Sequence, residues 1–284
     1  MTNIGNEQPQ QSTVSSETMS CMEVWGGSSA TWSSFTVPGL DLWVYSQPYD
    51  GAETGGDIYY VSSCASGRIT RIVLGDVSGH GLDASPHAAT LRSIIRKNVN
   101  YISQSRVVDA VNNQFEENST VGRFATALIG TYFQPKQELT VCSAGHPPPL
   151  IFRNQEQEWT PLVSEDSEDR NLPIGVLNDQ EFRSTSFRLQ QGDLIMGYSD
   201  ALSEARDANG NLLGEDGLAA IANDLPVTEP SRFVEQLILQ IRRTNDSNLV
   251  SDDATVIVAR VNDTRVSFRN NLMAPLRLMG GLFR

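Results

Sequence analysis

Aspartates stand at four strand termini in this sequence, and their type and spacing suggest chemistry. They are Asp57, Asp76, Asp200 and the adjacent pair Asp252 and Asp253, each beside glycine, serine or another aspartate. Oxygen ligands without an accompanying His or Cys cluster suit hard cations such as Mg²⁺ or Mn²⁺. Two such ions sharing a carboxylate can generate a hydroxide-like nucleophile at neutral pH, for which a phosphate ester is a natural substrate. The spacing alone also allows the plain alternative that aspartate favours turns and strand ends.

Asp57 and Asp76 are predicted to face each other across a β-hairpin. Residues 57–63 and 68–76 both have the composition of strands, and a short connection containing glycine separates them. With Ser66-Gly67 as the turn, Asp57 pairs with Asp76, and directly opposed Cβ atoms lie about 4.5–5.5 Å apart. Two carboxylates that close repel each other unless a cation lies between them or one is protonated. A register shift of one residue would remove this argument.

The segment after this hairpin is rich in glycine. Residues 75–81 read GDVSGHG and connect an apolar run to a helical pattern that begins at Ser85. Glycine tolerates positive φ and the close backbone approach that a metal or phosphate site requires. Many such segments are only turns, so this one indicates a binding site chiefly through the aspartate it carries.

The elements that must position these aspartates indicate an α+β fold. Strand-like runs follow one another through hairpin connections, which predicts mainly antiparallel sheets. Helical patterns lie between or after these runs, beginning at Ser85 and Ser105 and covering 215–223 and 230–243.

The overall composition excludes several classes of function. The net charge of −13, from 34 acidic and 21 basic residues, argues against sequence-independent nucleic-acid binding. The three cysteines are widely spaced and odd in number, so they suggest neither a disulfide framework nor a zinc site, and a reducing cytoplasm is the expected compartment. The sequence has no signal-peptide pattern and no apolar run near the roughly 18 residues of an integral membrane segment.

Two other hydrolytic chemistries fail on the sequence. A cysteine-dependent phosphatase needs an arginine six residues after its nucleophile, but Gly27, Thr70 and Pro148 occupy those positions. Residues 197–201 resemble a degenerate nucleophile elbow around Ser199, for which the histidine must come later in the chain. All three histidines precede Ser199, so this arrangement is excluded in its usual form.

Seven short blocks, in order, carry a family resemblance. The blocks are 55–57 (GGD), 75–81 (GDVSGHG), 123–126 (RFAT), 143–149 (SAGHPPP), 172–175 (LPIG), 198–206 (YSDALSEAR) and 252–255 (DDAT). With them the chain resembles the metal-dependent PPM protein phosphatases, in their bacterial SpoIIE/RsbU-like branch, over about residues 40–262.

This resemblance implies a fold and a set of ligands. The fold is a β-sandwich of two mainly antiparallel sheets flanked by helix pairs, with two Mn²⁺ or Mg²⁺ ions at one edge. Asp57 and Asp76 form the catalytic core, with Asp76 bridging the ions, and Asp252 rather than Asp253 is the implied ligand of the last pair. The implied metal-binding residues are Asp57, Asp76, Val77 through its carbonyl, Asp200 and Asp252.

The resemblance also implies an activity and its partners. A metal-activated water would attack phosphorus in line and dephosphorylate a protein serine or threonine. The expected substrate is a STAS-type anti-anti-sigma factor in a partner-switching pathway. Regulator binding or homodimer contacts are expected through the helices near 85–118.

One departure from the family pattern keeps alternatives open. Ala201 stands where the family usually has glycine, and alanine replaces glycine without strain only where φ is negative. The alternatives are a pseudophosphatase that binds a phosphoprotein without turnover and a metal-dependent phosphodiesterase that acts on small molecules.

The chain is expected to have three parts. Residues 1–39 form an N-terminal extension whose first 20 or so residues are polar and expected to be disordered. Residues 40–262 form the phosphatase domain, and Trp25, Trp32 and Phe35 are expected to pack on it. Residues 263–284 form a basic and apolar tail.

Overall fold

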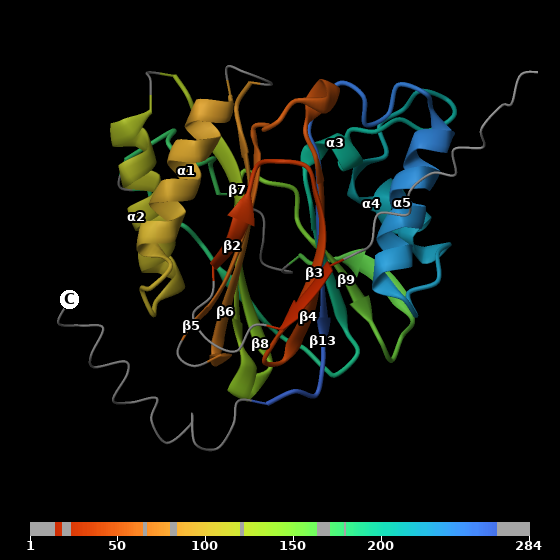
Figure 1. The fold of residues 1–284 in the computed structure, drawn as a ribbon, viewed down its shortest axis with the longest axis horizontal. Helices are drawn as coiled ribbons and strands as arrows, with labels where there is room; N and C mark the ends of the chain where they lie inside the picture. The colour runs from red at the N-terminus through yellow and green to blue at the C-terminus, as the bar shows by residue number, and fades with distance from the viewer. Residues whose placement is uncertain are drawn as a thin grey trace, which may run out of the picture.

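Two β-sheets pack face to face, and helices cover the outer face of each (Figure 1). The computed structural model describes residues 15–18, 24–64, 67–79, 84–119, 122–163, 171–178 and 180–265. The predicted α+β sandwich of mainly antiparallel sheets is therefore confirmed.

In the described residues, seven strands form one sheet and six form the other. The first sheet has the order β1 (Ser15–Thr18), β3 (Thr31–Val37), β4 (Leu40–Gln47), β13 (Ala254–Val261), β12 (Leu194–Tyr198), β9 (Leu150–Arg153), β10 (Glu158–Pro161). The second has the order β11 (Thr185–Arg188), β8 (Glu138–Ala144), β7 (Ala125–Phe133), β6 (Ile69–Val77), β5 (Asp57–Cys64), β2 (Val24–Gly27). The β1–β3 pair is parallel, and the other strand pairs are antiparallel.

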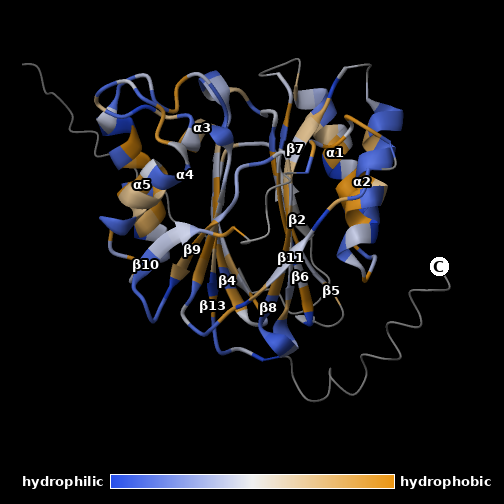
Figure 2. Ribbon diagram, turned by 180° about the vertical axis from the view of Figure 1, so that it is seen from behind, coloured by the Kyte–Doolittle hydropathy of each residue, from blue (hydrophilic) through white to orange (hydrophobic). Residues whose placement is uncertain are grey.

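The helices form two outer layers. α1 (Ser85–Asn98) and α2 (Gln104–Asn118) pack on the six-stranded sheet, and their cluster includes Leu91 and Phe115. α3 (Asp200–Ser203), α4 (Gly214–Asn223) and α5 (Pro230–Thr244) lie on the other side (Figure 1). The apolar faces of the long helices turn toward the sheets, as the orange stripes in Figure 2 show.

The sequence pattern explains how these layers form. Strand β4 alternates, with Leu40, Leu42 and Val44 buried between the sheets and the intervening residues turned toward the α5 side. In α5, Phe233 and Ile241 share a buried face, and the Phe233 ring stacks on Trp159 with centroids 5.1 Å apart. Both patterns place one apolar face toward a sheet, as the periods of strand and helix require.

The sheets begin before the predicted domain boundary. β2 pairs with β5, and β3 pairs along its length with β4, so a boundary at residue 40 separates two paired strands. We propose that the folded domain starts before β2. Trp32 and Phe35 pack on the domain as predicted, whereas the side chain of Trp25 falls outside the part of the chain that the structure describes. The first 20 or so residues, which were expected to be disordered, lie outside the described residues except for β1. The C-terminal tail lies outside them from residue 266 onward.

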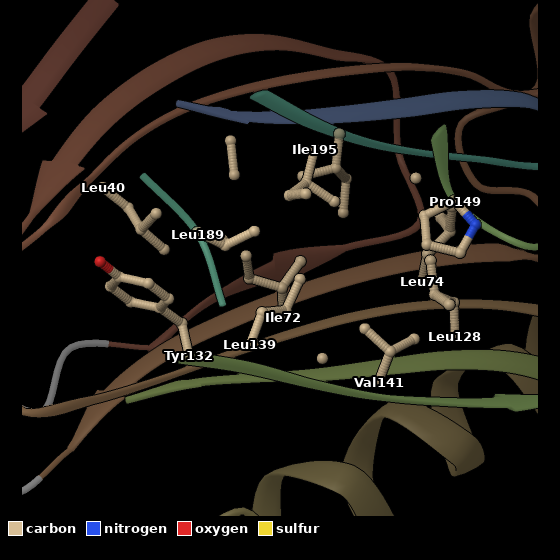
Figure 3. A pocket seen from close by; sticks show the side chains of 14 residues that line it. Leu40, Ile72, Leu74, Leu128, Tyr132, Leu139, Val141, Pro149, Leu189 and Ile195 are labelled. Atoms are coloured by element: carbon tan, nitrogen blue, oxygen red, sulfur yellow. The ribbon is translucent and has the colours of Figure 1, made fainter. Parts of the chain in front are cut away.

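A small apolar cavity of about 40 Å³ lies between the sheets, and the residues that line it include Leu74, Leu128 and Ile195 (Figure 3). Gly130, in the middle of β7, lines it. A Cβ at Gly130 would lie 3.5 Å from the Leu139 side chain, which is an ordinary contact.

Gly130→Ala is therefore expected to stabilise the protein by about 0.5–1 kcal/mol, because alanine restricts the unfolded chain and adds contacts at the cavity. Urea unfolding measures this. Gly75→Ala, in the neighbouring strand, is the control. Its Cβ would lie 3.1 Å from Ile58, so it should not stabilise. An equal gain for both variants would contradict the cavity argument.

Candidate metal centre

Asp57 and Asp76 lie directly opposite each other on β5 and β6. This is the register predicted from the hairpin, and it is confirmed. Asp57 is only 3% exposed, and its Oδ2 atom has no hydrogen-bond partner within the described residues. A buried carboxylate oxygen without a partner is costly, so the pair is suited to a cation between the strand ends.

The backbone around this pair is tightly packed. The Val77 amide donates to the Gly56 carbonyl at 3.4 Å, and the Ser78 amide donates to the Phe124 carbonyl at 3.0 Å. A Cβ on Gly56 would lie 3.2 Å from the Val77 carbonyl oxygen. Glycine therefore allows the start of β5 to approach the Val77 carbonyl, which the family resemblance assigns as a ligand.

Asp200 and Asp252 reach the same end of the sandwich from neighbouring strands. Asp200 follows β12 and Asp252 precedes β13, and these strands are paired. Ser199 joins them, since its amide donates to the Thr255 carbonyl at 2.9 Å and its hydroxyl accepts from the Thr255 amide at 2.9 Å. Ser199 is fully buried. Ser199 therefore holds the end of β12 to the start of β13. Sequence reasoning did not predict this role.

Asp253 contacts backbone amides. Its Oδ1 accepts from the Tyr49 amide at 2.6 Å, and its Oδ2 accepts from the amides of Gly56 at 2.6 Å and Asp57 at 3.3 Å. A Cβ on Gly55 would clash with both of these oxygens. Asp253 thus fastens the loop that carries Asp57. The two glycines before Asp57 were the available signal for this contact.

His146 connects the two sheets, because it contacts Thr126 of β7 in one and Tyr198 of β12 in the other. Its Nε2 lies 3.0 Å from the Tyr198 carbonyl, and its Nδ1 lies 2.8 Å from the Thr126 hydroxyl. Because a carbonyl only accepts, Nε2 carries the proton and Nδ1 accepts from Thr126. Burial lowers the pKa of His146 to about 4, against the effect of the Tyr198 hydrogen bond. His146 is therefore a neutral structural residue near pH 7.

The carboxylates raise one another's pKa values. Burial, followed by the Asp76 charge, raises the pKa of Asp57 well above its ordinary range, while a Thr255 hydrogen bond acts in the opposite direction. Burial and then the charge of Asp200 raise the pKa of Asp76 to about 7. Burial and then the charge of Asp252 raise the pKa of Asp200 to about 6. Glu204, which sequence reasoning did not single out, also raises the pKa values of Asp76 and Asp200.

The candidate ligand atoms at this end of the sandwich are of the chemical type that hard divalent cations prefer. They are carboxylate oxygens, and one of them is buried without a hydrogen-bond partner among the described residues. This set matches the preference of Mg²⁺ and Mn²⁺. Among the described residues, no three His, Cys, Asp or Glu side chains gather closely enough to hold one ion. Waters would complete the coordination, as is usual for Mg²⁺, which keeps several waters beside one or two carboxylates.

Comparison with known proteins decides the family. Residues 66–262 match the SpoIIE family, described as Stage II sporulation protein E. This chain belongs to the SpoIIE family. The branch predicted from the seven sequence blocks is therefore confirmed.

Two curated relatives of this SpoIIE-family chain come from Bacillus subtilis (strain 168). Phosphoserine phosphatase RsbU is 26% identical over 226 residues, which cover 78% of this chain and 63% of RsbU. Phosphoserine phosphatase RsbP is 22% identical over 242 residues, which cover 81% of this chain and 55% of RsbP. The chain thus spans less than two thirds of the length of these relatives.

Solved structures share the fold of this SpoIIE-family chain. The RsbU and RsbW domains of Rv1364c from Mycobacterium tuberculosis align with a TM-score of 0.68 at 22% identity, covering 89% of this chain and 72% of that one. The PP2C phosphatase domain and a fragment of the regulatory domain of SpoIIE from Bacillus subtilis align with a TM-score of 0.66 at 19% identity. The alignment covers 86% of this chain and 64% of that chain. Within the described residues, no helix has the length and apolar character needed to cross a membrane.

The family departure at Ala201 is accommodated in this SpoIIE-family chain. Ala201 lies inside the helical turn α3. In the described residues, the non-glycine positions with positive φ are Asp50, Gln137, Gln157 and Leu249. Ala201 is not among them, so its methyl group imposes no left-handed strain on the turn that carries Asp200.

Proposed function

We propose that this chain is a metal-dependent protein serine/threonine phosphatase. The observation that carries the proposal is the opposed Asp57–Asp76 pair. Asp57 is buried, and its Oδ2 has no hydrogen-bond partner within the described residues, at the end of the sandwich where Asp200 and Asp252 also lie. Membership of the SpoIIE family and similarity to proteins named phosphoserine phosphatases support it.

The proposed residues divide the work between binding and positioning. Two Mn²⁺ or Mg²⁺ ions, when bound, would supply Lewis acidity and lower the pKa of water for hydrolysis of a phosphate ester. We assign their binding to the side chains of Asp57, Asp76, Asp200 and Asp252 and to the Val77 carbonyl. Asp253, His146 and Ser199 position those ligands through the hydrogen bonds described above.

The proposed substrate is a STAS-type anti-anti-sigma factor phosphorylated on serine or threonine, within a partner-switching pathway in the cytoplasm. The names of the curated relatives, both called phosphoserine phosphatases, support phosphoserine as the group that is hydrolysed. We also propose that a regulator or a second copy of the chain binds through α1 and α2.

A turnover assay tests the function. The purified chain is given p-nitrophenyl phosphate, a phosphoserine STAS protein and bis-p-nitrophenyl phosphate, each with Mn²⁺ and with EDTA. Hydrolysis of both monoesters that requires Mn²⁺ is the expected result. Turnover indifferent to EDTA would overturn the metal mechanism. Preference for the diester would indicate the phosphodiesterase, and Mn²⁺ binding without turnover would indicate a pseudophosphatase.

Ala201→Gly is expected to leave kcat/KM on p-nitrophenyl phosphate within about twofold, because the alanine imposes no positive-φ strain. The same change should lower stability by about 0.5–1 kcal/mol, since glycine is a poor helix former. Mn²⁺-dependent kinetics and thermal unfolding measure both effects. A tenfold gain in activity would show instead that the methyl group at residue 201 hinders the site.

A further inference from the structure

A second pocket, of about 280 Å³, opens beside the candidate metal centre. Its walls are the end of β4 and the following turn (residues 47–51), Arg242 of α5, and residues 249, 250 and 252. The segment that links α5 to β13 runs along the upper rim of the molecule in Figure 1. Asp252 lines this pocket and also belongs to the carboxylate cluster, so the pocket adjoins the proposed catalytic site at Asp252.

Arg242 is the basic residue among the described residues that line this pocket. Its Nη2 donates to the Gln47 Oε1 at 2.9 Å and to the Tyr45 hydroxyl at 3.5 Å, and both acceptors are neutral. No ion pair joins Arg242 to a carboxylate in the part of the chain that the structure describes. A guanidinium has five N–H donors in a fixed fork, so Arg242 retains donors for a ligand.

Arg242 is the feature of this pocket that favours an acidic ligand, although two aspartates also lie in its wall. The other two charged residues in its wall are Asp50, which is exposed to solvent, and Asp252, which the proposed function assigns to a metal ion. Water screens the charge of Asp50, and a bound cation would offset the charge of Asp252. Arg242 is half-buried, and a charge-assisted hydrogen bond from arginine to a carboxylate is stronger than a neutral one.

We propose that this pocket binds an acidic side chain of the phosphoprotein substrate, with Arg242 as the residue that recognises it. The inference rests on the proposed phosphatase function. Because the pocket shares Asp252 with the metal centre, a phosphoserine held there places neighbouring residues at the pocket. An extended chain advances about 3.3–3.6 Å per residue, so the acidic residue lies within a few positions of the phosphoserine.

Arg243 provides a matched control. Both arginines lie in the last turn of α5, where cations interact favourably with the helix dipole. Arg243 is exposed and does not line the pocket. Arg243→Gln therefore removes the same charge from the same helix turn without touching the pocket.

Peptide binding tests the proposal without requiring turnover. Three fluorescein-labelled peptides carry a non-hydrolysable phosphonate analogue of phosphoserine, flanked on both sides by glutamate, glutamine or lysine. Fluorescence anisotropy with Mn²⁺ measures Kd for the wild type, Arg242→Gln and Arg243→Gln. The wild type should bind the glutamate peptide best. Arg242→Gln should weaken that binding about tenfold, which is the scale of one charge-assisted contact, and should leave the glutamine peptide within twofold.

The remaining outcomes overturn the proposal. Equal losses for Arg242→Gln and Arg243→Gln would indicate a general charge effect, and preference for the glutamine or lysine peptide would exclude an acidic ligand. Hydrolysis of p-nitrophenyl phosphate by each variant is measured separately. If the wild type does not hydrolyse p-nitrophenyl phosphate, the proposed function fails. If the wild type hydrolyses it but does not distinguish the three peptides, only the pocket inference fails.

Discussion

Asp76→Asn is expected to lower Mn²⁺-dependent turnover strongly and, without metal at pH 8, to make the protein more stable than the wild type. Burial, with the charges of Asp200 and Asp252, raises the pKa of Asp76 to about 7. An ionised Asp76 therefore destabilises the metal-free native state, and asparagine removes that charge without changing the shape of the side chain. The expected gain is about 2–4 kcal/mol, at 1.36 kcal/mol per unit of pKa shift.

The sign of the pH dependence follows from proton binding. Between the ordinary pKa of 3.8 and the native value of about 7, the native state holds a proton on Asp76 that the unfolded state has released. The contribution of Asp76 to stability thus falls as the pH rises through this window. The advantage of Asp76→Asn should be largest at pH 8 and smaller at pH 5. His146, whose depressed pKa makes it favour folding at higher pH, is common to both proteins and cancels in the comparison.

Urea unfolding in EDTA and in Mn²⁺ at the two pH values measures these effects. Mn²⁺ should stabilise the wild type, more at pH 8 than at pH 5, and should leave Asp76→Asn almost unchanged. Turnover should fall by roughly 10²–10³-fold or more, the scale for loss of one charge-stabilising group. Asp216→Asn, on the exposed first turn of α4, is the control for net charge. A metal-free Asp76→Asn protein less stable than the wild type at pH 8 would contradict the repulsion argument.

The features that sequence reasoning predicted correctly are local ones. The register of Asp57 and Asp76 depends on a single short connection, so the positions of the hairpin strands determine which residues face each other. The helical pattern predicted over 230–243 is observed as α5, Pro230–Thr244. Such patterns can be interpreted from the sequence alone, because the periods of strand and helix are intrinsic to the backbone and determine which residues share a face.

The features that it missed join distant parts of the chain. Ser199 bonds to Thr255, and His146 bonds to Thr126 and Tyr198. No periodicity predicts such contacts, which depend on how the strands are ordered in the two sheets. The strand β3 was missed for a different reason: its sequence, TWSSFTV, is rich in serine and threonine and lies in the expected extension, so its pairing with β4 was not apparent.

The neighbours Asp252 and Asp253 allow the ligand and anchoring roles to be separated. Asp253 accepts hydrogen bonds from three backbone amides with both carboxylate oxygens. In Asp253→Asn, one oxygen becomes an NH₂ group that faces N–H donors and cannot accept from them. Asp252 Oδ1 accepts from the Asp253 amide at 2.8 Å, and an asparagine at residue 252 can retain that bond through its own oxygen.

The same substitution is therefore expected to have opposite effects at the two positions. Without metal at pH 8, Asp253→Asn should lose about 2 kcal/mol of stability, since hydrogen bonds from buried amides to a charged acceptor are lost, although relief of repulsion toward Asp57 offsets part of the loss. Asp252→Asn should be as stable as the wild type or more stable, because it removes a charge that raises the pKa values of Asp76 and Asp200. Urea unfolding in EDTA measures the stability of each variant, and calorimetric titration with Mn²⁺ measures its affinity for the metal.

Asp252→Asn should lose Mn²⁺ affinity without losing stability, whereas the main loss in Asp253→Asn should be in stability. Equal stability losses for the two variants would mean that both aspartates anchor the loop.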